Sequence, residues 1–338
     1  MYESFYRFNG APFQLTPDSR FFFESRVHAR ALAHLQFGLA QGEGFVIVTG
    51  EVGAGKTTLV ERLWTQLDRE AYVMARISTT QLSGDDLFRM AMAGFGVEGA
   101  EAGADKSALL LRFEQVLHLH RAAGRRCLLV VDEVQSLSLA ALEELRMLSN
   151  LTENGRAALQ TILLGQPQFR RMLASPDLDQ LRQRVLASYH LGPLTASDTR
   201  AYIEHRLATA GWDGSNPHWD DAAFAAVYRH SGGLPRRINR LCARVLLYGA
   251  LEESQRIAAE MVDTTARELD DDLETGAIPS SHAGNGHAGA AVPHLAVEAL
   301  RHALREDDLL HRVETLEQQM ARREKVFQRL LDVLGAQR

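Results

Sequence analysis

The sequence has 338 residues, of which 46% are hydrophobic and 24% charged, a composition typical of a soluble globular protein. The length exceeds that of one typical domain and predicts two folded units with an appendage. No apolar run approaches the ~20 residues that cross a bilayer, and the start of the chain lacks the basic and apolar regions of a signal peptide, so we expect a cytoplasmic protein. A net charge of −6 gives no global attraction to nucleic acid or anionic lipid, and nucleic acid is therefore the less favoured partner.

Lysine and cysteine are both scarce in this chain. Lys56, Lys106 and Lys325 are the only lysines among 37 basic residues, so we expect the choice of lysine to matter where it occurs. Cys127 and Cys242 lie far apart without a CxxC or Cys/His spacing, which predicts two core residues and no metal or redox site.

The first half of the chain alternates between two periodicities. Apolar residues recur at spacings of three and four from 25 to 41, which predicts an amphipathic helix, and an apolar run over 44–49 then predicts a buried strand that ends at Gly50. Five strands that alternate with helices predict an α/β fold, with a parallel sheet covered by helices on both faces. The other expected strands are 71–77, 127–131, 159–164 and 186–191, and the other expected helices are 57–67, 85–94, 106–120 and 139–151.

Beyond Pro193 the strand pattern stops. Helical periodicity then predicts a small all-helical lid domain, and the Gly-, Ala- and Ser-rich stretch from 275 to 293 buries too little surface to order itself, which predicts a flexible linker. The expected lid helices are 196–210, 220–230, 235–250 and 258–273.

The last segment carries an apolar seam sustained over nearly four heptads. Such a seam predicts a coiled-coil-like helix that pairs with another helix, with a single solvated amphipathic helix as the alternative. Its members are Leu309, Val313, Leu316, Met320, Phe327, Leu330 and Leu334.

The string GEVGAGKT from Gly50 to Thr57 matches the phosphate-binding pattern GxxxxGK[ST], and it lies between an expected strand and an expected helix. Its glycines let the backbone N–H groups point at phosphate oxygens, and the start of the helix adds its positive end. We expect Lys56 to reach the β- and γ-phosphates of ATP and the hydroxyl of Thr57 to bind Mg²⁺. The nucleotide-binding residues expected here are Gly50, Val52, Gly53, Ala54, Gly55, Lys56, Thr57, Thr58 and Asp132.

Two acids end the apolar run LLVV. A buried parallel strand presents such residues at the carboxyl edge of the sheet, where open α/β sheets bind ligands. Asp132 is then expected to hold Mg²⁺ together with Thr57, and Glu133 to orient the attacking water as its base. An acidic pair after a strand is often only a helix N-cap, and the phosphate loop upstream is what favours the catalytic interpretation here.

These two motifs, followed by a helical domain, resemble the AAA+ ATPases. The string SGGLPRRIN resembles their sensor-2 motif, which implies that Arg236 reaches the γ-phosphate from the lid. The string LRQRV resembles the segment that carries the arginine finger and implies that role for Arg184, although Arg182 and Arg184 are also typical of solvated surface arginines. The string LLGQ stands at the sensor-1 position, with Gln166 as its polar residue. The expected catalytic residues are Glu133, Gln166, Arg184 and Arg236.

Over about residues 1–270 the chain resembles, more narrowly, the ExeA/GspA-type secretion ATPases, and among them the ATPases of exopolysaccharide and PEP-CTERM (exosortase) gene clusters. Val134 departs from the usual DEAQ without touching the chemistry, and the membrane helix of some members is missing from the sequence. The resemblance is carried by the strings FYRFNGAPFQLTPDSRFFF, GEGFVIVTGEVGAGKTT, VVDEVQSLSLAALEELRMLSNL, LLGQPQF, LRQRV, YHLGPL and GGLPRRINRLC.

The amino-terminal string PFQLTPD, residues 12–18, has two interpretations. It is a surface turn anchored by Phe13, or, as the resemblance implies, it packs near the adenine. The expected domains are an amino-terminal box at 1–24, the ATPase core at 25–193, the lid at 194–273, the linker at 274–293 and the amphipathic helix at 294–338.

The sequence therefore predicts a Mg²⁺-dependent AAA+ ATPase that hydrolyses ATP to drive assembly or remodelling of an envelope export system for exopolysaccharide or protein. The resemblance implies a homo-oligomer, either a ring or an ATP-dependent assembly, with a protein partner bound through the last helix. A peripheral position at the inner membrane is the alternative to a free cytoplasmic one. Two rival functions stay open: a DNA-associated ATPase of the transposition target-selection type, and a scaffold switched by ATP.

Overall fold

The computed structural model describes residues 2–16, 18–78, 82–98, 105–153 and 155–275. By its internal contacts the chain divides into Met1–Asp270 and Asp271–Arg338. Residues 276–338 lie outside the described residues. They include most of the expected linker and all of the expected heptad segment.

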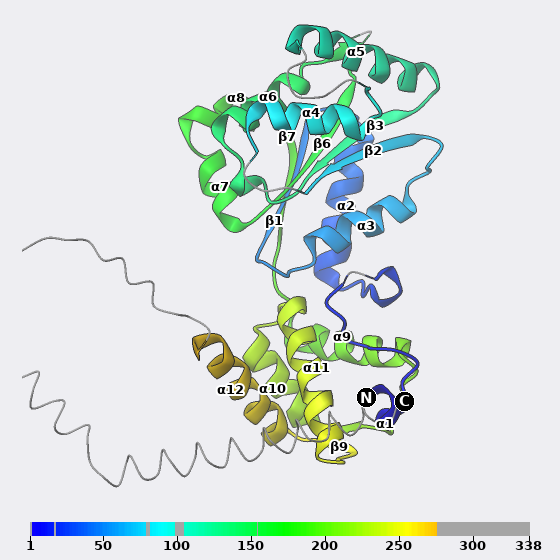
Figure 1. Ribbon diagram of the computed structural model, residues 1–338, viewed down its shortest axis with the longest axis vertical. Helices are drawn as coiled ribbons and strands as arrows, with labels where there is room; N and C mark the ends of the chain where they lie inside the picture. The colour runs from blue at the N-terminus through cyan, green and yellow to red at the C-terminus, as the bar shows by residue number, and fades with distance from the viewer. Residues whose placement is uncertain (1, 17, 79–81, 99–104, 154, 276–338) are drawn as a thin grey trace, which may run out of the picture. The chain divides into compact units, whose positions relative to one another are not determined.

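Five parallel strands form the central sheet, in the order β2-β3-β6-β1-β7 (Figure 1). Each of the five expected strands is present within one residue of its expected ends, because every one is an apolar run bounded by loop residues. The predicted α/β fold is thereby confirmed. The strands are β1 (Phe45–Gly50), β2 (Tyr72–Ile77), β3 (Arg126–Val131), β6 (Leu159–Gly165) and β7 (Val185–Leu191).

Helices cover both faces of this sheet, as predicted (Figure 1). Alternate strand residues face opposite sides: Phe45 and Ile47 of β1 belong to one buried cluster, and Val46 and Val48 to another. The first cluster lies under α4 (Gly84–Gly94), α5 (Lys106–Ala122) and α6 (Leu139–Leu148), and the second under α2 (Arg26–Gln41) and α3 (Lys56–Gln66).

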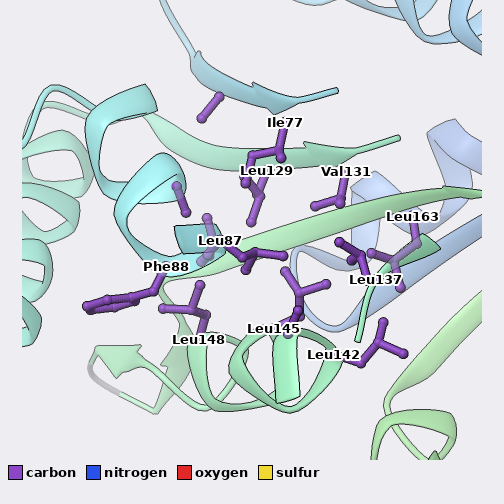
Figure 2. Packing of buried hydrophobic residues seen from close by; sticks show 14 of the residues in the cluster. Ile77, Leu87, Phe88, Leu129, Val131, Leu137, Leu142, Leu145, Leu148 and Leu163 are labelled. Atoms are coloured by element: carbon purple, nitrogen blue, oxygen red, sulfur yellow. The ribbon is translucent and has the colours of Figure 1, made fainter. Parts of the chain in front are cut away.

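Figure 2 shows the first cluster, in which leucines of α6 meet strand residues such as Leu129 and Leu163. Each large side chain buried in this way contributes about 1.5–3 kcal/mol. Leu129 and Leu163 are completely buried, so an apolar layer joins the sheet to the helices on this side.

Several short elements were not expected from the sequence. Among them, α7 (Pro167–Leu173) follows directly on β6, and α8 (Asp179–Arg182) leads into β7. Pro167 occupies the first turn of α7, where the missing N–H of proline costs no hydrogen bond. Others are α1 (Tyr2–Tyr6), the three 3₁₀ turns η1 (Ser19–Phe21), η2 (Val134–Ser136) and η3 (Pro176–Leu178), and the hairpin of β4 (Thr152–Glu153) and β5 (Arg156–Ala157).

The last third of the described chain, from α9 onward, forms the expected helical part. Its helices are α9 (Ala196–Thr209), α10 (Asp221–Ser231), α11 (Pro235–Leu251) and α12 (Ala259–Thr275). Their apolar faces share one buried cluster that includes Leu207, Val227 and Val245. A short parallel pair, β8 (His218–Trp219) with β9 (Arg256–Ile257), adds a contact that the helical periodicity did not predict.

The amino-terminal residues pack into this helical cluster. Tyr6, Phe8, Phe13 and Phe21 are buried in it, and the hydroxyl of Tyr6 donates to the carbonyl oxygen of Ser254 at 3.0 Å. With an exposed fraction of 1%, Phe13 anchors the amino-terminal box, while contact of the box with adenine stays a prediction.

Arg206 of α9 binds the backbone of the amino-terminal box. This buried guanidinium donates to the carbonyl oxygens of Pro12 and Gln14 at 2.5 and 3.4 Å and to the Tyr202 hydroxyl at 2.9 Å. It also lies 4.8 Å from the centre of the Phe21 ring, at cation–π distance. Main-chain carbonyls and aromatic rings thus take the place that a carboxylate usually has beside a buried arginine.

We predict that Arg206→Met lowers the free energy of unfolding by about 3 kcal/mol, because two carbonyls and one hydroxyl lose a charged donor inside the core. The matched control is Arg240→Met on exposed α11 surface, expected to stay within about 0.5 kcal/mol. Urea unfolding of both variants measures the difference. Equal losses in the two variants would contradict the anchoring role.

Candidate functional site

The loop between β1 and α3 has the backbone that a phosphate cradle requires. Gly53 and Gly55 have φ angles of +80° and +98°, in the left-handed region that favours glycine. A Cβ atom at Gly55 would lie 2.8 Å from Nε2 of His28, so this position also needs glycine for space. The loop therefore opens directly into α3, with the N-terminus of that helix at its end.

Lys56 is buried inside this loop, with an exposed fraction of 6%. Its ammonium donates to the carbonyl oxygens of Gly50 at 2.9 Å and Glu51 at 3.1 Å. Burial lowers the pKa of Lys56, and the carboxylates of Glu133, Asp132 and Glu51 oppose that shift only in part. A cation held by two carbonyls gains by exchanging them for phosphate oxygens, since charge-assisted bonds between ions are stronger.

Thr57 and Asp132 meet across the loop and the end of β3. The Thr57 hydroxyl donates to Oδ2 of Asp132 at 2.8 Å, and that carboxylate is buried. These two oxygens fit Mg²⁺, which takes one or two protein oxygens and completes its octahedron with water and phosphate. The residue pair expected to bind the metal is thus brought together.

The guanidinium of Arg76 also lies beside the carboxylate of Asp132. Nη2 of Arg76, from β2, lies 3.4 Å from Oδ2 of Asp132, and Nη1 lies 3.4 Å from the carboxylate of Glu61 on α3. Positive charge is therefore already favoured at the oxygen assigned to the metal. Sequence analysis missed Arg76, although an arginine within the apolar run of 71–77 was a visible signal.

Glu133 follows Asp132 in a left-handed conformation, with φ of +52°, which is uncommon for a residue with a side chain. Its Oε2 accepts hydrogen bonds from Nε2 of Gln135 at 2.5 Å and Nε2 of Gln166 at 3.0 Å. Burial raises the pKa of Glu133, but these two bonds and the charges of Lys56 and Arg236 outweigh it and bring the pKa below its usual value. Glu133 is therefore held as a carboxylate.

The turn after Glu133 presses against the end of β6. Val134 is fully buried, and a Cβ atom at Gly165 would lie 2.8 Å from its Cγ2 atom. Gly165 thus lets the turn approach β6 closely. Gln166, the next residue, lies beside Glu133, to which its side chain donates a hydrogen bond, and its sensor-1 role stays a prediction.

Arg236 lies in the first turn of α11, and its backbone N–H donates to the carbonyl oxygen of Gly53 at 3.2 Å. A Cβ atom at Gly53 would lie 2.3 Å from the Cβ atom of Arg236, so glycine permits this contact as well. The charge of Arg236 acts on Glu133. The expected sensor-2 residue therefore stands beside the phosphate loop.

Arg184 lies elsewhere. It precedes β7, and its carbonyl oxygen accepts from the N–H of Phe45, the first residue of β1, at 2.9 Å. The strands are parallel and the loop follows the last residue of β1, so Arg184 stands at the opposite edge of the sheet from Lys56. The fold therefore does not bring Arg184 to the phosphate loop of its own chain.

Sequence analysis also missed His28, at the start of α2. Its Nδ1 lies 2.7 Å from the hydroxyl of Ser25, and its ring also bonds the backbone of Ala54 in the phosphate loop. Burial lowers the pKa of His28, and the bond to Ala54 opposes that shift. A histidine at a helix start carried no sequence signal that separates this role from an ordinary core histidine.

A parallel sheet with this strand order, a phosphate loop after β1 and acids after β3 define a P-loop nucleotide-binding protein of the AAA class. The family described as "AAA domain" matches residues 39–173. General secretion pathway protein A of Aeromonas hydrophila is 38% identical over 270 residues, which are 80% of this chain and 48% of that protein. The chain thus belongs to the AAA family, in the group that resembles general secretion pathway protein A (ExeA/GspA).

Solved structures agree on the fold. The Cdc6p protein of Pyrobaculum aerophilum matches with a TM-score of 0.60 and 15% identity over 77% of this chain and 74% of that chain. The ORC2 protein of Aeropyrum pernix, in its ADP form, matches with a TM-score of 0.58 and 15% identity over 79% and 78% of the two chains. In the part of this chain that the structure describes, no helix is long and apolar enough to span a bilayer.

Proposed function

We propose that this protein hydrolyses ATP with the help of Mg²⁺. The observation that carries the proposal is the meeting of a buried lysine, the Thr57–Asp132 pair and a hydrogen-bonded glutamate at one edge of the sheet. These groups have separate tasks in phosphoryl transfer, namely binding phosphate, holding a metal and orienting water. Because the tasks are separate, substitutions of these residues should impair different steps, such as nucleotide binding and hydrolysis.

Each residue acts on a different part of the substrate. Lys56 and the loop N–H groups bind the phosphates, and Glu133 orients the attacking water and accepts its proton. Gln166 and Arg236 contact the γ-phosphate from the sheet edge and from the helical part. Thr57 and Asp132 would hold Mg²⁺, which neutralises charge on the phosphate oxygens when it is bound.

We predict that Lys56→Ala loses nucleotide affinity, whereas Glu133→Gln still binds ATP and loses hydrolysis, because phosphate binding and proton transfer belong to different steps. For Glu133→Gln we expect kcat to fall by about 10²–10⁴. Binding of a fluorescent ATP analogue and single-turnover hydrolysis measure the two steps. Turnover of Glu133→Gln at the parent rate would overturn the assignment of the base.

We further propose a homo-oligomer in which Arg184 completes the site of a neighbouring subunit. Its position at the edge of its own sheet opposite the phosphate loop supports this arrangement. Its guanidinium also makes only a long hydrogen bond there, 3.4 Å to the carbonyl oxygen of Ser149. Arg182, the other candidate, forms an ion pair with Asp179 at 2.7 Å. Arg184 is the better finger because fewer bonds hold it.

Turnover per subunit should therefore rise with protein concentration, and Arg184→Ala should remove that rise, since a finger supplied by a neighbour is worth roughly 10³-fold or more. A mixture of Arg184→Ala and Lys56→Ala subunits is the sharper measurement. Each variant contributes what the other lacks, so activity should return in the mixture. A mixture as inactive as its parts would rule out a shared site.

We propose that the work done by hydrolysis is the assembly or remodelling of an envelope export system. The relationship to general secretion pathway protein A supports this role, and the exopolysaccharide or exosortase setting is the narrower form of the proposal. We assign partner binding, at or near the inner membrane, to residues 294–338, which lie outside the described residues.

One observation favours the DNA-associated alternative. A hollow of about 660 Å³ at the edge of the sheet away from Lys56 is lined by four arginines and one acid, Glu43. Two of the arginines are engaged, however: Arg126 donates to the carbonyl oxygen of Leu39 at 2.7 Å, and Arg121 donates to that of Ala157 at 3.0 Å. Bonds to main-chain carbonyls give these two arginines a structural task, so we place DNA second.

Capture from cell extract distinguishes the two functions. We expect the full chain to retain an envelope export component, and a chain that ends at Asp272 to lose it while keeping ATP affinity. Retention of the full chain on duplex DNA, falling steeply between about 50 and 200 mM salt, would favour the DNA-associated function instead. Capture without any ATP turnover would favour the ATP-switched scaffold.

A further inference from the structure

Gln135 stands between two groups of the proposed site, and no role has yet been assigned to it. It lies in η2, two residues beyond Glu133, and its side chain is partly buried. Both ends of its amide are used. Nε2 donates to Oε2 of Glu133 at 2.5 Å, and Oε1 accepts from the backbone N–H of Gln166 at 2.9 Å.

A neutral amide suits position 135 because one of the two groups that it contacts needs a hydrogen-bond donor and the other needs an acceptor. The carboxylate of Glu133 accepts hydrogen bonds, and the N–H of Gln166 donates one. Glutamate at position 135 would offer only acceptors and lysine only donors, while an amide offers both. The chemistry of the pair therefore selects glutamine over the other long polar side chains.

The local backbone makes this bridge more important. Glu133 has a left-handed φ angle of +52°, a conformation that a residue with a side chain keeps only where the surrounding structure holds it. Gln166 also binds Oε2 of Glu133, through its side chain at 3.0 Å. Gln135, Glu133 and Gln166 thus form a closed set of three hydrogen bonds between the end of β3 and the end of β6.

We propose that Gln135 is a positioning residue that fixes the carboxylate of Glu133 for catalysis and ties it to the backbone of Gln166. The inference rests on the proposed hydrolytic function, in which Glu133 is the base. When the side chain of Gln166 turns to a γ-phosphate, the bond from Gln135 still holds Oε2 of Glu133. Oε1 of Glu133 then remains available to the attacking water.

The test compares Gln135→Met with Gln135→Glu. Methionine has the length of glutamine and neither of its bonds, whereas glutamate keeps an acceptor for Gln166 but cannot donate to Glu133. The matched control is Gln160→Met, which removes a buried amide bonded to the carbonyl oxygens of Gly38 and Glu43, at 2.7 and 3.1 Å, at the opposite end of β6.

Both Gln135 variants should keep ATP affinity within about twofold of the parent while kcat falls by about 10- to 100-fold, since misplacing a reacting group by about 1 Å costs on the order of 10²-fold. Gln160→Met should keep kcat per folded molecule. Parent kcat in Gln135→Met, or an equal loss in Gln160→Met, would overturn the proposal.

A double-mutant cycle tests whether Gln135 acts through Glu133. In the Glu133→Gln background, Gln135→Met should change single-turnover hydrolysis by less than about twofold, because the group it positions is gone. Full additivity of the two losses would overturn the positioning role. Failure of the proposed function is distinguishable, since Glu133→Gln alone would then hydrolyse ATP at the parent rate.

A readout without turnover completes the test. Hydrogen exchange at the amide of Gln166 should accelerate about tenfold or more in Gln135→Met, which removes its acceptor, and stay near the parent rate in Gln135→Glu. Gln160→Met should leave this amide protected. Unchanged exchange in Gln135→Met would show that the bridge is absent in solution and would overturn the inference.

Discussion

The hydrogen-bonded register of the parallel sheet is the constraint on which the site depends. Val131 pairs with Ile77 on one side and with Leu163 on the other, and Thr49 pairs with Gly165. The residues that follow these positions therefore meet at one edge, in a fixed order. A shift of one residue in β3 would turn its side chains to the other face and separate the acids from the loop.

Mixed charge is the second organising feature, because the site holds cations beside anions before any substrate arrives. Lys56 lies near the carboxylates of Asp132 and Glu133, and Arg76 forms an ion pair with Asp132. The scarce lysines fit such tasks, since an ammonium is compact and donates in several directions. Lys106 repeats the arrangement away from the site, where it binds Glu144 at 2.5 Å and Asp85 at 3.1 Å and so joins α5 to α6 and α4.

Much of this fold could be predicted from the sequence, because buried parallel strands are short apolar runs and the phosphate loop has a fixed spacing. The five strands are examples. Long-range pairing outside the recognised motifs could not be predicted, since no local pattern encodes it. Gln135 and Arg76 contact partners on other elements, and neither interpretation of the amino-terminal string, a surface turn or a contact with adenine, predicted that Phe13 lies inside the helical cluster.

The amino-terminal residues are synthesised long before the residues that bury them. Tyr6 binds Ser254 across a sequence separation of 248 residues, and Arg206 binds Pro12 across 194. At about 5–20 residues per second, the ribosome takes on the order of 10–50 s to make the partner of Tyr6. During that time the aromatic side chains of the first segment are already outside the ribosome without their binding site. The nascent chain thus exposes apolar surface of the kind that chaperones bind, and the helical part closes only after Ser254 has been synthesised.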